Sequence, residues 1–119
     1  MKDTKYFKAK EFQCKCGCNT NGIEQSFVDK LTQAREIAGI PFVITSGYRC
    51  AEHNKAVGGV AGSAHTTGWA VDISAGTGEQ KFKIVKALID VGFTRIGVAK
   101  TFIHVDMDST KPSPTIWLY

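Results

Sequence analysis

Residues 46–72 read Ser-Gly-Tyr-Arg-Cys-Ala-Glu-His-Asn-Lys-Ala-Val-Gly-Gly-Val-Ala-Gly-Ser-Ala-His-Thr-Thr-Gly-Trp-Ala-Val-Asp, and the rest of the chain is organised around this stretch. Its second half contains Ser63-x-His65-x-x-Gly68-x-Ala70-x-Asp72, and a second piece, Phe102-Ile-His104-Val-Asp106, follows further along the chain. Two imidazoles and a carboxylate form a donor set that zinc accepts in catalytic sites, where three protein ligands leave a fourth position open. We therefore predict that His65, Asp72 and His104 bind one zinc ion.

Polar residues interrupt two apolar segments that have the composition of strands. Asp72 lies within Trp69–Ile73, and His104 and Asp106 lie within Phe102–Met107. A single histidine is usually a satisfied polar residue, but a buried carboxylate is costly unless it is paired or bound to a metal. Because alternate residues of a strand share a face, His104 and Asp106 are expected to face the same pocket.

With Ser46-Gly-Tyr-Arg49 before it and Ile103-His104-Val-Asp106 after it, the Ser63-x-His65 motif resembles the D-Ala-D-Ala carboxypeptidase-like zinc peptidases, peptidase family M15. The resemblance covers residues 12–107. It implies that His65, Asp72 and His104 are the zinc ligands. It also implies that Arg49 pairs with a substrate carboxylate or carbonyl oxygen. Such enzymes cut peptidoglycan stem peptides or cross-links, as carboxypeptidases or endopeptidases of phage lysis (endolysins) or of bacterial wall remodelling.

The expected chemistry is peptide hydrolysis by a metal-activated water, with Arg49 and Ser63 holding the substrate. Better-known members of the family often place an acid or a histidine shortly before the last ligand, but Lys100, Thr101 and Phe102 stand there in this chain. Asp106 is therefore the candidate general base, or else it orients a ligand imidazole. Without a base, the alternative is a catalytically silent module that binds the cell wall and retains the zinc.

The chain has four cysteines, and three of them alternate in Cys14-Lys-Cys16-Gly-Cys18, with Cys50 far away in the sequence. Structural zinc sites usually space their cysteine pairs by two to four residues, so this spacing is a poor match to a zinc finger or ribbon. A four-cysteine metal site that mediates contacts, a disulfide involving Cys50, and idle thiols all remain open.

The apolar spacing predicts amphipathic helices over residues 23–38 and 77–91, a short helix over 50–57, and strands over 42–45 and 69–74. Segments 94–98 and 101–107 are predicted to form a hairpin, and Trp117 and Tyr119 to pack back onto the body. Residues 58–63 are predicted to form a small, flexible loop that lets a substrate backbone approach. Together with the resemblance, this predicts an α+β domain. The resemblance implies that the sheet is antiparallel with helices packed on one side, as in hedgehog and DD-peptidase domains.

The 119 residues predict one domain, 1–119, and their 43% hydrophobic and 22% charged content is ordinary for a globular protein. The net charge of +4 includes five lysines between Lys2 and Lys15, but there are only three arginines and no basic stripe, so we expect no nucleic-acid partner. No apolar run predicts a membrane span, and the first residues do not read as a signal peptide. We expect a monomer that is cytoplasmic on synthesis and acts on the wall when released or exported.

Overall fold

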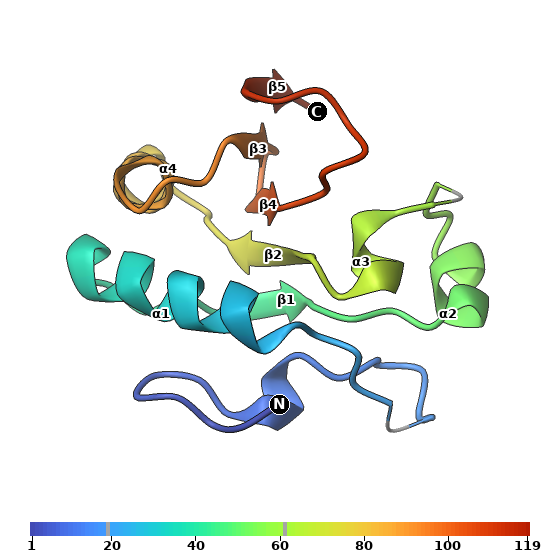
Figure 1. Ribbon diagram of the computed structural model, residues 1–119. Helices are drawn as coiled ribbons and strands as arrows, with labels where there is room; N and C mark the ends of the chain where they lie inside the picture. Colours follow the sequence, from blue (N-terminus) through green and yellow to red (C-terminus); the bar gives the residue numbers. More distant parts are fainter. Residues whose placement is uncertain (19, 61) are drawn as a thin grey trace.

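The computed structural model describes residues 1–18, 20–60 and 62–119, and it has an α+β fold. The described strands form one sheet in the order β1-β2-β4-β3-β5 (Figure 1). The strands are β1 (Ile44–Ser46), β2 (Ala70–Ser74), β3 (Arg95–Val98), β4 (Phe102–Asp106) and β5 (Thr115–Leu118). The expected hairpin is confirmed, because β3 and β4 pair antiparallel.

The sheet is mixed, so the prediction of an antiparallel sheet is wrong at one edge. β1, β2, β4 and β3 pair antiparallel in turn, but β5 pairs parallel with β3. The cause is the chain order: β4 and β5 are joined by a returning loop and run in opposite directions, and β3 lies between them. Pro112 and Pro114 made a strand in the tail hard to predict, since proline is disfavoured inside the hydrogen-bonded part of a β-sheet. Pro114 directly precedes β5, which begins at Thr115, so neither proline interrupts this edge strand.

Two long helices cover one face of the sheet. They are α1 (Gln25–Ala38) and α4 (Gly78–Asp90), as the apolar spacing predicted. Their buried residues join the inward residues of the strands in one hydrophobic core, which includes Phe27, Leu31, Ile84, Leu88, Val71, Ile73, Ile103 and Val105. Thr77 caps α4 and Gln80 returns the bond in a capping box, which fixes where this helix begins.

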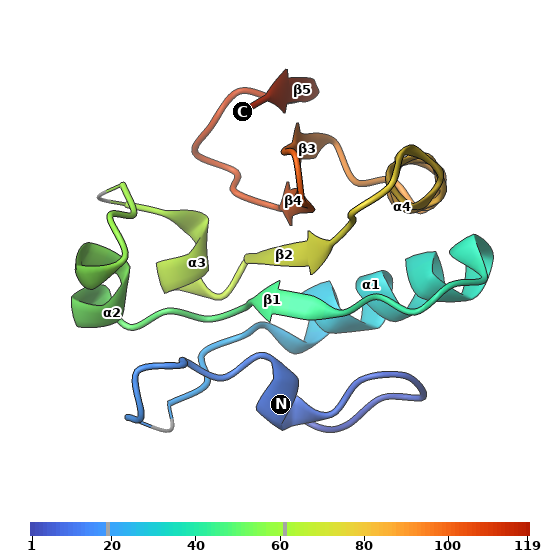
Figure 2. The same ribbon diagram turned by 180° about the vertical axis from the view of Figure 1, so that it is seen from behind.

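The structure also has three shorter helical elements: η1 (Ala9–Glu11), α2 (Ala51–Ala56) and α3 (Ala64–Thr67). Figures 1 and 2 place α2 and α3 on the opposite side of the molecule from α4. The short α2 was expected, whereas the sequence patterns predict no helix over residues 64–67. The loop predicted over 58–63 includes Ala61, which lies outside the described residues.

Gly68 explains how so short a helix ends where it does. It adopts a left-handed conformation with φ of 84° at the C-terminus of α3. A Cβ there would lie 1.9 Å from the carbonyl oxygen of Gly22, so only glycine allows the backbone of residues 22–23 to approach. The Glu24 amide then donates to the Gly68 carbonyl at 3.0 Å, which joins the start of α1 to the end of α3.

The other face of the sheet carries polar groups. In β4, Ile103 and Val105 enter the core, while Phe102, His104 and Asp106 line a cavity on the opposite face. In β2, Asp72 occupies the same face and pairs in register with His104. The period-2 alternation of these strands therefore places the polar residues away from α1 and α4.

Candidate metal centre and active site

Three side chains from separate elements converge at one point: His65 of α3, Asp72 of β2 and His104 of β4. Their candidate ligand atoms all lie within 4.8 Å of one another. Asp72 Oδ1 is 2.9 Å from His104 Nδ1 and 3.5 Å from His65 Nε2. We call these three residues the His–Asp cluster.

The second nitrogen of each imidazole is already bonded to the protein. His65 Nδ1 lies 2.8 Å from the Gly47 carbonyl oxygen, which can only accept. His104 Nε2 lies 2.7 Å from Asp106 Oδ2. With Nδ1 of His65 and Nε2 of His104 held in this way, His65 Nε2 and His104 Nδ1 are the nitrogens that face Asp72. A bound metal would take their lone pairs in place of the protons that these nitrogens can donate to Asp72. Histidines that bind metals are held in this way in proteins, so the arrangement fits a metal.

The electrostatics of the His–Asp cluster also favour a cation. Burial opposes ionisation of Asp72, but hydrogen bonds from His104 and His65 outweigh it and lower the pKa of this carboxyl to about 2. Burial likewise opposes protonation of His104, but bonds to Asp106 and Asp72 raise the pKa of this imidazole. Two carboxylates thus stabilise positive charge between them, whether that charge is a proton or a metal ion. The nitrogen and oxygen donors suit zinc, which accepts both.

A cavity of about 350 Å³ opens over the His–Asp cluster. Its lining includes Arg49, Ser63 and Arg95 as well as the aromatic side chains of Phe102, Trp117 and Tyr119. This volume is in the range of ligand pockets, roughly 300–1,000 Å³. The lining thus combines apolar surface from aromatic and small residues with charged groups.

Arg49 reaches this cavity from the loop that follows β1. Its Nη1 donates to Asn54 Oδ1 at 3.0 Å, and its amide donates to the His65 carbonyl at 3.0 Å. Its Nε is buried, yet among the described residues it has no hydrogen-bond partner. Buried donors are normally satisfied, so this group fits a site that a ligand oxygen completes.

Ser63 has a structural bond as well as a place in the cavity wall. Its Oγ accepts from the His65 amide at 3.2 Å and thereby caps α3, which carries the first ligand. The hydroxyl hydrogen remains able to donate to a bound molecule. The Ser63-x-His65 spacing is thus explained by a helix cap followed at once by a ligand.

Asp106 is almost fully buried, with 3% of its surface exposed. Its Oδ2 bonds His104, and its Oδ1 accepts from Arg95 Nε at 2.7 Å and from the Asp108 amide at 3.1 Å. Burial raises the pKa of Asp106, but the hydrogen bonds from His104, Asp108 and Arg95 lower it by a larger amount, so the pKa lies below the ordinary value. A carboxylate with these bonds is better suited to orient His104 than to accept a proton.

Sequence reasoning missed Arg95 and Trp117. Arg95 is buried in β3 and joins Asp106 to the wall of the cavity, with its guanidinium 4.9 Å from the centre of the Trp117 ring. Trp117 in turn lies 5.6 Å from the His104 ring. An arginine inside the apolar segment 94–98 was the signal for Arg95. Trp117 reaches the cavity because it stands on β5, a strand that the sequence patterns did not predict.

A protein-family model described as Peptidase M15 matches residues 5–106 of the chain. The chain belongs to the M15 peptidases. Its matched region contains the whole His–Asp cluster together with Arg49, Ser63 and Asp106. A search of curated proteins finds no match to the chain.

M15 peptidases are metal-dependent, and the described part of the chain offers two groups of side chains able to hold a metal: the His–Asp cluster and a group of four cysteines. The resemblance inferred from the sequence is thus confirmed at the level of the family. In the described part of the chain, none of the helices has the length and apolar character needed to cross a membrane.

Proposed function

We propose that this protein is a zinc-dependent peptidase that hydrolyses peptide bonds in peptidoglycan stem peptides or cross-links. The observation that carries the proposal is the His–Asp cluster in the lining of a cavity, with its candidate ligand atoms within 4.8 Å of one another and the second nitrogen of each ring already bonded. Zinc bound there would supply a Lewis acid that lowers the pKa of a water and polarises a carbonyl. His65, Asp72 and His104 would hold it.

Arg49 is proposed to bind the substrate. Its unpartnered Nε and its position in the cavity wall suit a carboxylate or a carbonyl oxygen. A guanidinium group can bind both oxygens of a carboxylate through two parallel hydrogen bonds, whereas a carbonyl group offers it only one oxygen. A terminal D-alanine carboxylate would use the fork fully, so this residue favours carboxypeptidase over endopeptidase activity.

Ser63 and Asp106 are proposed to act beside Arg49. The Ser63 hydroxyl can donate to the oxygen on which negative charge develops, which is a stabilising role in acyl transfer. Asp106 is proposed to hold His104 Nε2 and so present Nδ1 to the metal. The competing role is that of general base, for which it is the sole carboxylate besides Asp72 among the described residues that line the cavity.

The alternative function is a silent module that binds the wall and keeps the metal. The observation in its favour is that Asp106 already accepts three hydrogen bonds, so no unengaged carboxylate faces the cavity among the residues described. A silent module would bind peptidoglycan without releasing fragments. Catalysis by acid–base groups is typically worth roughly 10²–10⁴-fold, so its loss would leave a slow enzyme or none.

The test is to incubate the zinc-loaded protein with purified peptidoglycan and with a free stem pentapeptide ending in D-Ala-D-Ala, and to identify the products by mass spectrometry. Release of one D-alanine from the pentapeptide identifies a carboxypeptidase. Cleavage of cross-links alone identifies an endopeptidase. Binding of peptidoglycan with no new amine ends in either substrate would establish the silent module and overturn the proposed activity.

The matched control is His65→Ala, which removes one proposed ligand. It should bind less metal and release no product. Arg35→Ala serves as the second control, because this arginine contacts Tyr6 and Phe7 away from the site. It should keep activity per folded molecule.

A further inference from the structure

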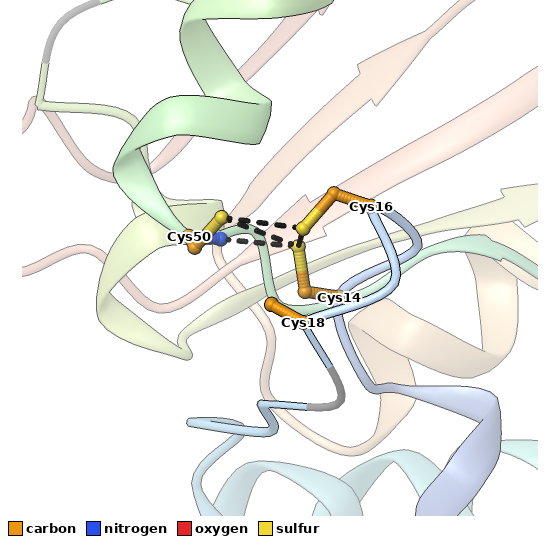
Figure 3. Close-up of side chains that lie close together, drawn as sticks. All are labelled: Cys14, Cys16, Cys18 and Cys50. Atoms are coloured by element: carbon orange, nitrogen blue, oxygen red, sulfur yellow. Dashed lines mark hydrogen bonds between the residues drawn. The ribbon is translucent and has the colours of Figure 1, made fainter.

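A second group of side chains, outside the cavity, gathers the four cysteines of the chain. Cys14, Cys16 and Cys18 come from the loop before α1, and Cys50 is the residue that precedes α2. Figure 3 shows the sulfur atoms of Cys14 and Cys16 meeting that of Cys50. All four Sγ atoms lie within 4.8 Å of one another. We call these residues the cysteine cluster.

The distances within this cluster suit a shared metal ion. Cys14 Sγ is 3.4 Å from Cys16 Sγ and 3.6 Å from Cys50 Sγ, and Cys16 Sγ is 3.6 Å from Cys50 Sγ. A tetrahedral zinc with Zn–S bonds of about 2.3 Å separates its sulfurs by about 3.8 Å. A disulfide would bring one pair to about 2.0 Å and leave the other two thiols aside. Here three sulfurs are mutually equidistant to within 0.2 Å.

Backbone amides point at two of these sulfurs. The Cys50 amide donates to Cys14 Sγ at 3.4 Å, and the His53 amide donates to Cys50 Sγ at 3.4 Å. Sulfur is a weak acceptor as a thiol but a much better one as a thiolate, the form that binds metals. Hydrogen bonds of this kind orient and stabilise metal ligands. They are a second observation, independent of the clustering, that indicates a ligand.

The exposed residues of this loop gain little from apolar burial, and the Cys14 amide closes the loop by donating to the Thr20 carbonyl at 2.8 Å. Residues 15–18 are all exposed, and Cys14 alone of the three loop cysteines is buried. Fixing a residue's backbone costs about 1–2 kcal/mol, which exposed side chains do not offset by apolar burial. Gly17 adopts a φ of 92°, which turns the chain between Cys16 and Cys18. This turn brings together cysteines whose single-residue spacing had counted against a metal site.

We propose that Cys14, Cys16, Cys18 and Cys50 bind a structural zinc ion that joins the loop before α1 to the segment carrying Arg49. Four thiolates in a tetrahedron suit zinc, which carries no redox chemistry and in a structural site needs no open position. Cys50 follows Arg49 directly in the sequence, so the ion fixes one neighbour of the proposed substrate-binding residue. The proposal does not depend on the peptidase activity.

The first test uses the unmodified chain, purified with zinc and dialysed against metal-free buffer. A thiol-specific reagent is added, and the released zinc is followed with a colorimetric chelator. We expect about one zinc per chain to leave as the four thiols react. Absence of zinc release overturns the proposal. So does a count of two free thiols in protein denatured without reductant, because that count indicates a disulfide.

The second test loads the chain with cobalt and records the thiolate-to-cobalt charge-transfer band. Cys18→Ser should lose or strongly weaken this band. Because Cys18 is exposed, the substitution should leave the fold intact, so loss of the band would report loss of a metal ligand. The matched control is Thr20→Ala, which removes the hydroxyl 2.9 Å from Cys18 Sγ but leaves every thiol in place, and it should keep the band. His65→Ala should also keep the band, which separates this site from the His–Asp cluster. An unchanged band in Cys18→Ser, or none in the parent, contradicts the four-cysteine site.

Discussion

The second nitrogen of each histidine ring decides which nitrogen is left to face Asp72. The Gly47 carbonyl takes Nδ1 of His65, and Asp106 takes Nε2 of His104, so the two rings present different nitrogens to one point. This asymmetry follows from the elements that carry them. His65 stands on a single turn of helix beside the loop after β1, whereas His104 stands in a strand whose next same-face residue is Asp106.

The Arg49 side chain is expected to act on the substrate rather than on the fold. Arg49→Ala removes one bond, to Asn54, so the cost in the free energy of unfolding should be about 0.5–1.5 kcal/mol. Cleavage should fall sharply, and Arg49→Lys should restore little of it, because a lysine keeps the charge but not the fork. Thermal melts alongside cleavage rates check this. A large loss of stability with activity per folded molecule unchanged would show a structural role.

The two roles of Asp106 make different predictions for Asp106→Asn. If this residue positions His104, zinc affinity should fall by about tenfold or more while the zinc-saturated enzyme stays fairly active. If it is the base, zinc affinity should hold and activity should fall by about a hundredfold or more. A chelator titration beside a cleavage assay at saturating zinc separates the two. The geometry favours the first result, and the second would return Asp106 to the base.

At the scale of elements, the one-turn helix α3 is expected to be the weak point of the site. Ser63→Ala removes its cap and should cost about 0.5–2 kcal/mol of stability. Thr77→Ala removes the equivalent cap of α4, far from the His–Asp cluster, and should cost a similar amount. The predicted difference is functional: only Ser63→Ala should weaken zinc binding. Equal zinc affinity in the two variants would mean that the cap does not position His65.

Sequence patterns predicted the elements that are long or strongly alternating. The apolar spacing gave α1 and α4, and the polar residues inside apolar segments gave β2 and β4 together with the three residues of the His–Asp cluster. What the sequence hid depends on contacts between distant segments. The parallel pairing of β5 with β3 and the turn of α3 against the Gly22 backbone are tertiary arrangements that leave no local period.

The cysteine cluster is likewise a contact between distant segments that the sequence alone does not predict. Cys14-Lys-Cys16-Gly-Cys18 has the wrong spacing for a familiar zinc finger, and no local rule places Cys50 beside it. The folded chain does so because the Tyr48 amide donates to the Phe12 carbonyl at 2.8 Å, which aligns the two segments just before their cysteines. The four cysteines therefore come together because of the fold rather than because of their spacing in the sequence.

For the whole molecule, metal removal should lower thermal stability, because both proposed sites join separate segments of the chain. A ligand at one hundred times its Kd stabilises the native state by about 2.7 kcal/mol. A chelator should therefore lower the Tm of the parent, and by less in His65→Ala, where only the cysteine cluster remains to lose its ion. Calorimetry with and without the chelator checks this. An unchanged Tm in the parent would mean that neither site holds a metal tightly.

Hydrolysis should depend on one metal ion held by His65, Asp72 and His104. The most direct measurement strips the protein of metal, returns zinc in small steps, and records the rate of stem-peptide cleavage at each step. We predict that the rate rises with occupancy of this site and saturates, and that Asp72→Ala shows no cleavage at any zinc concentration. Cleavage by the stripped protein at the parent's rate, or full activity in Asp72→Ala, would show that hydrolysis does not depend on a metal at this site.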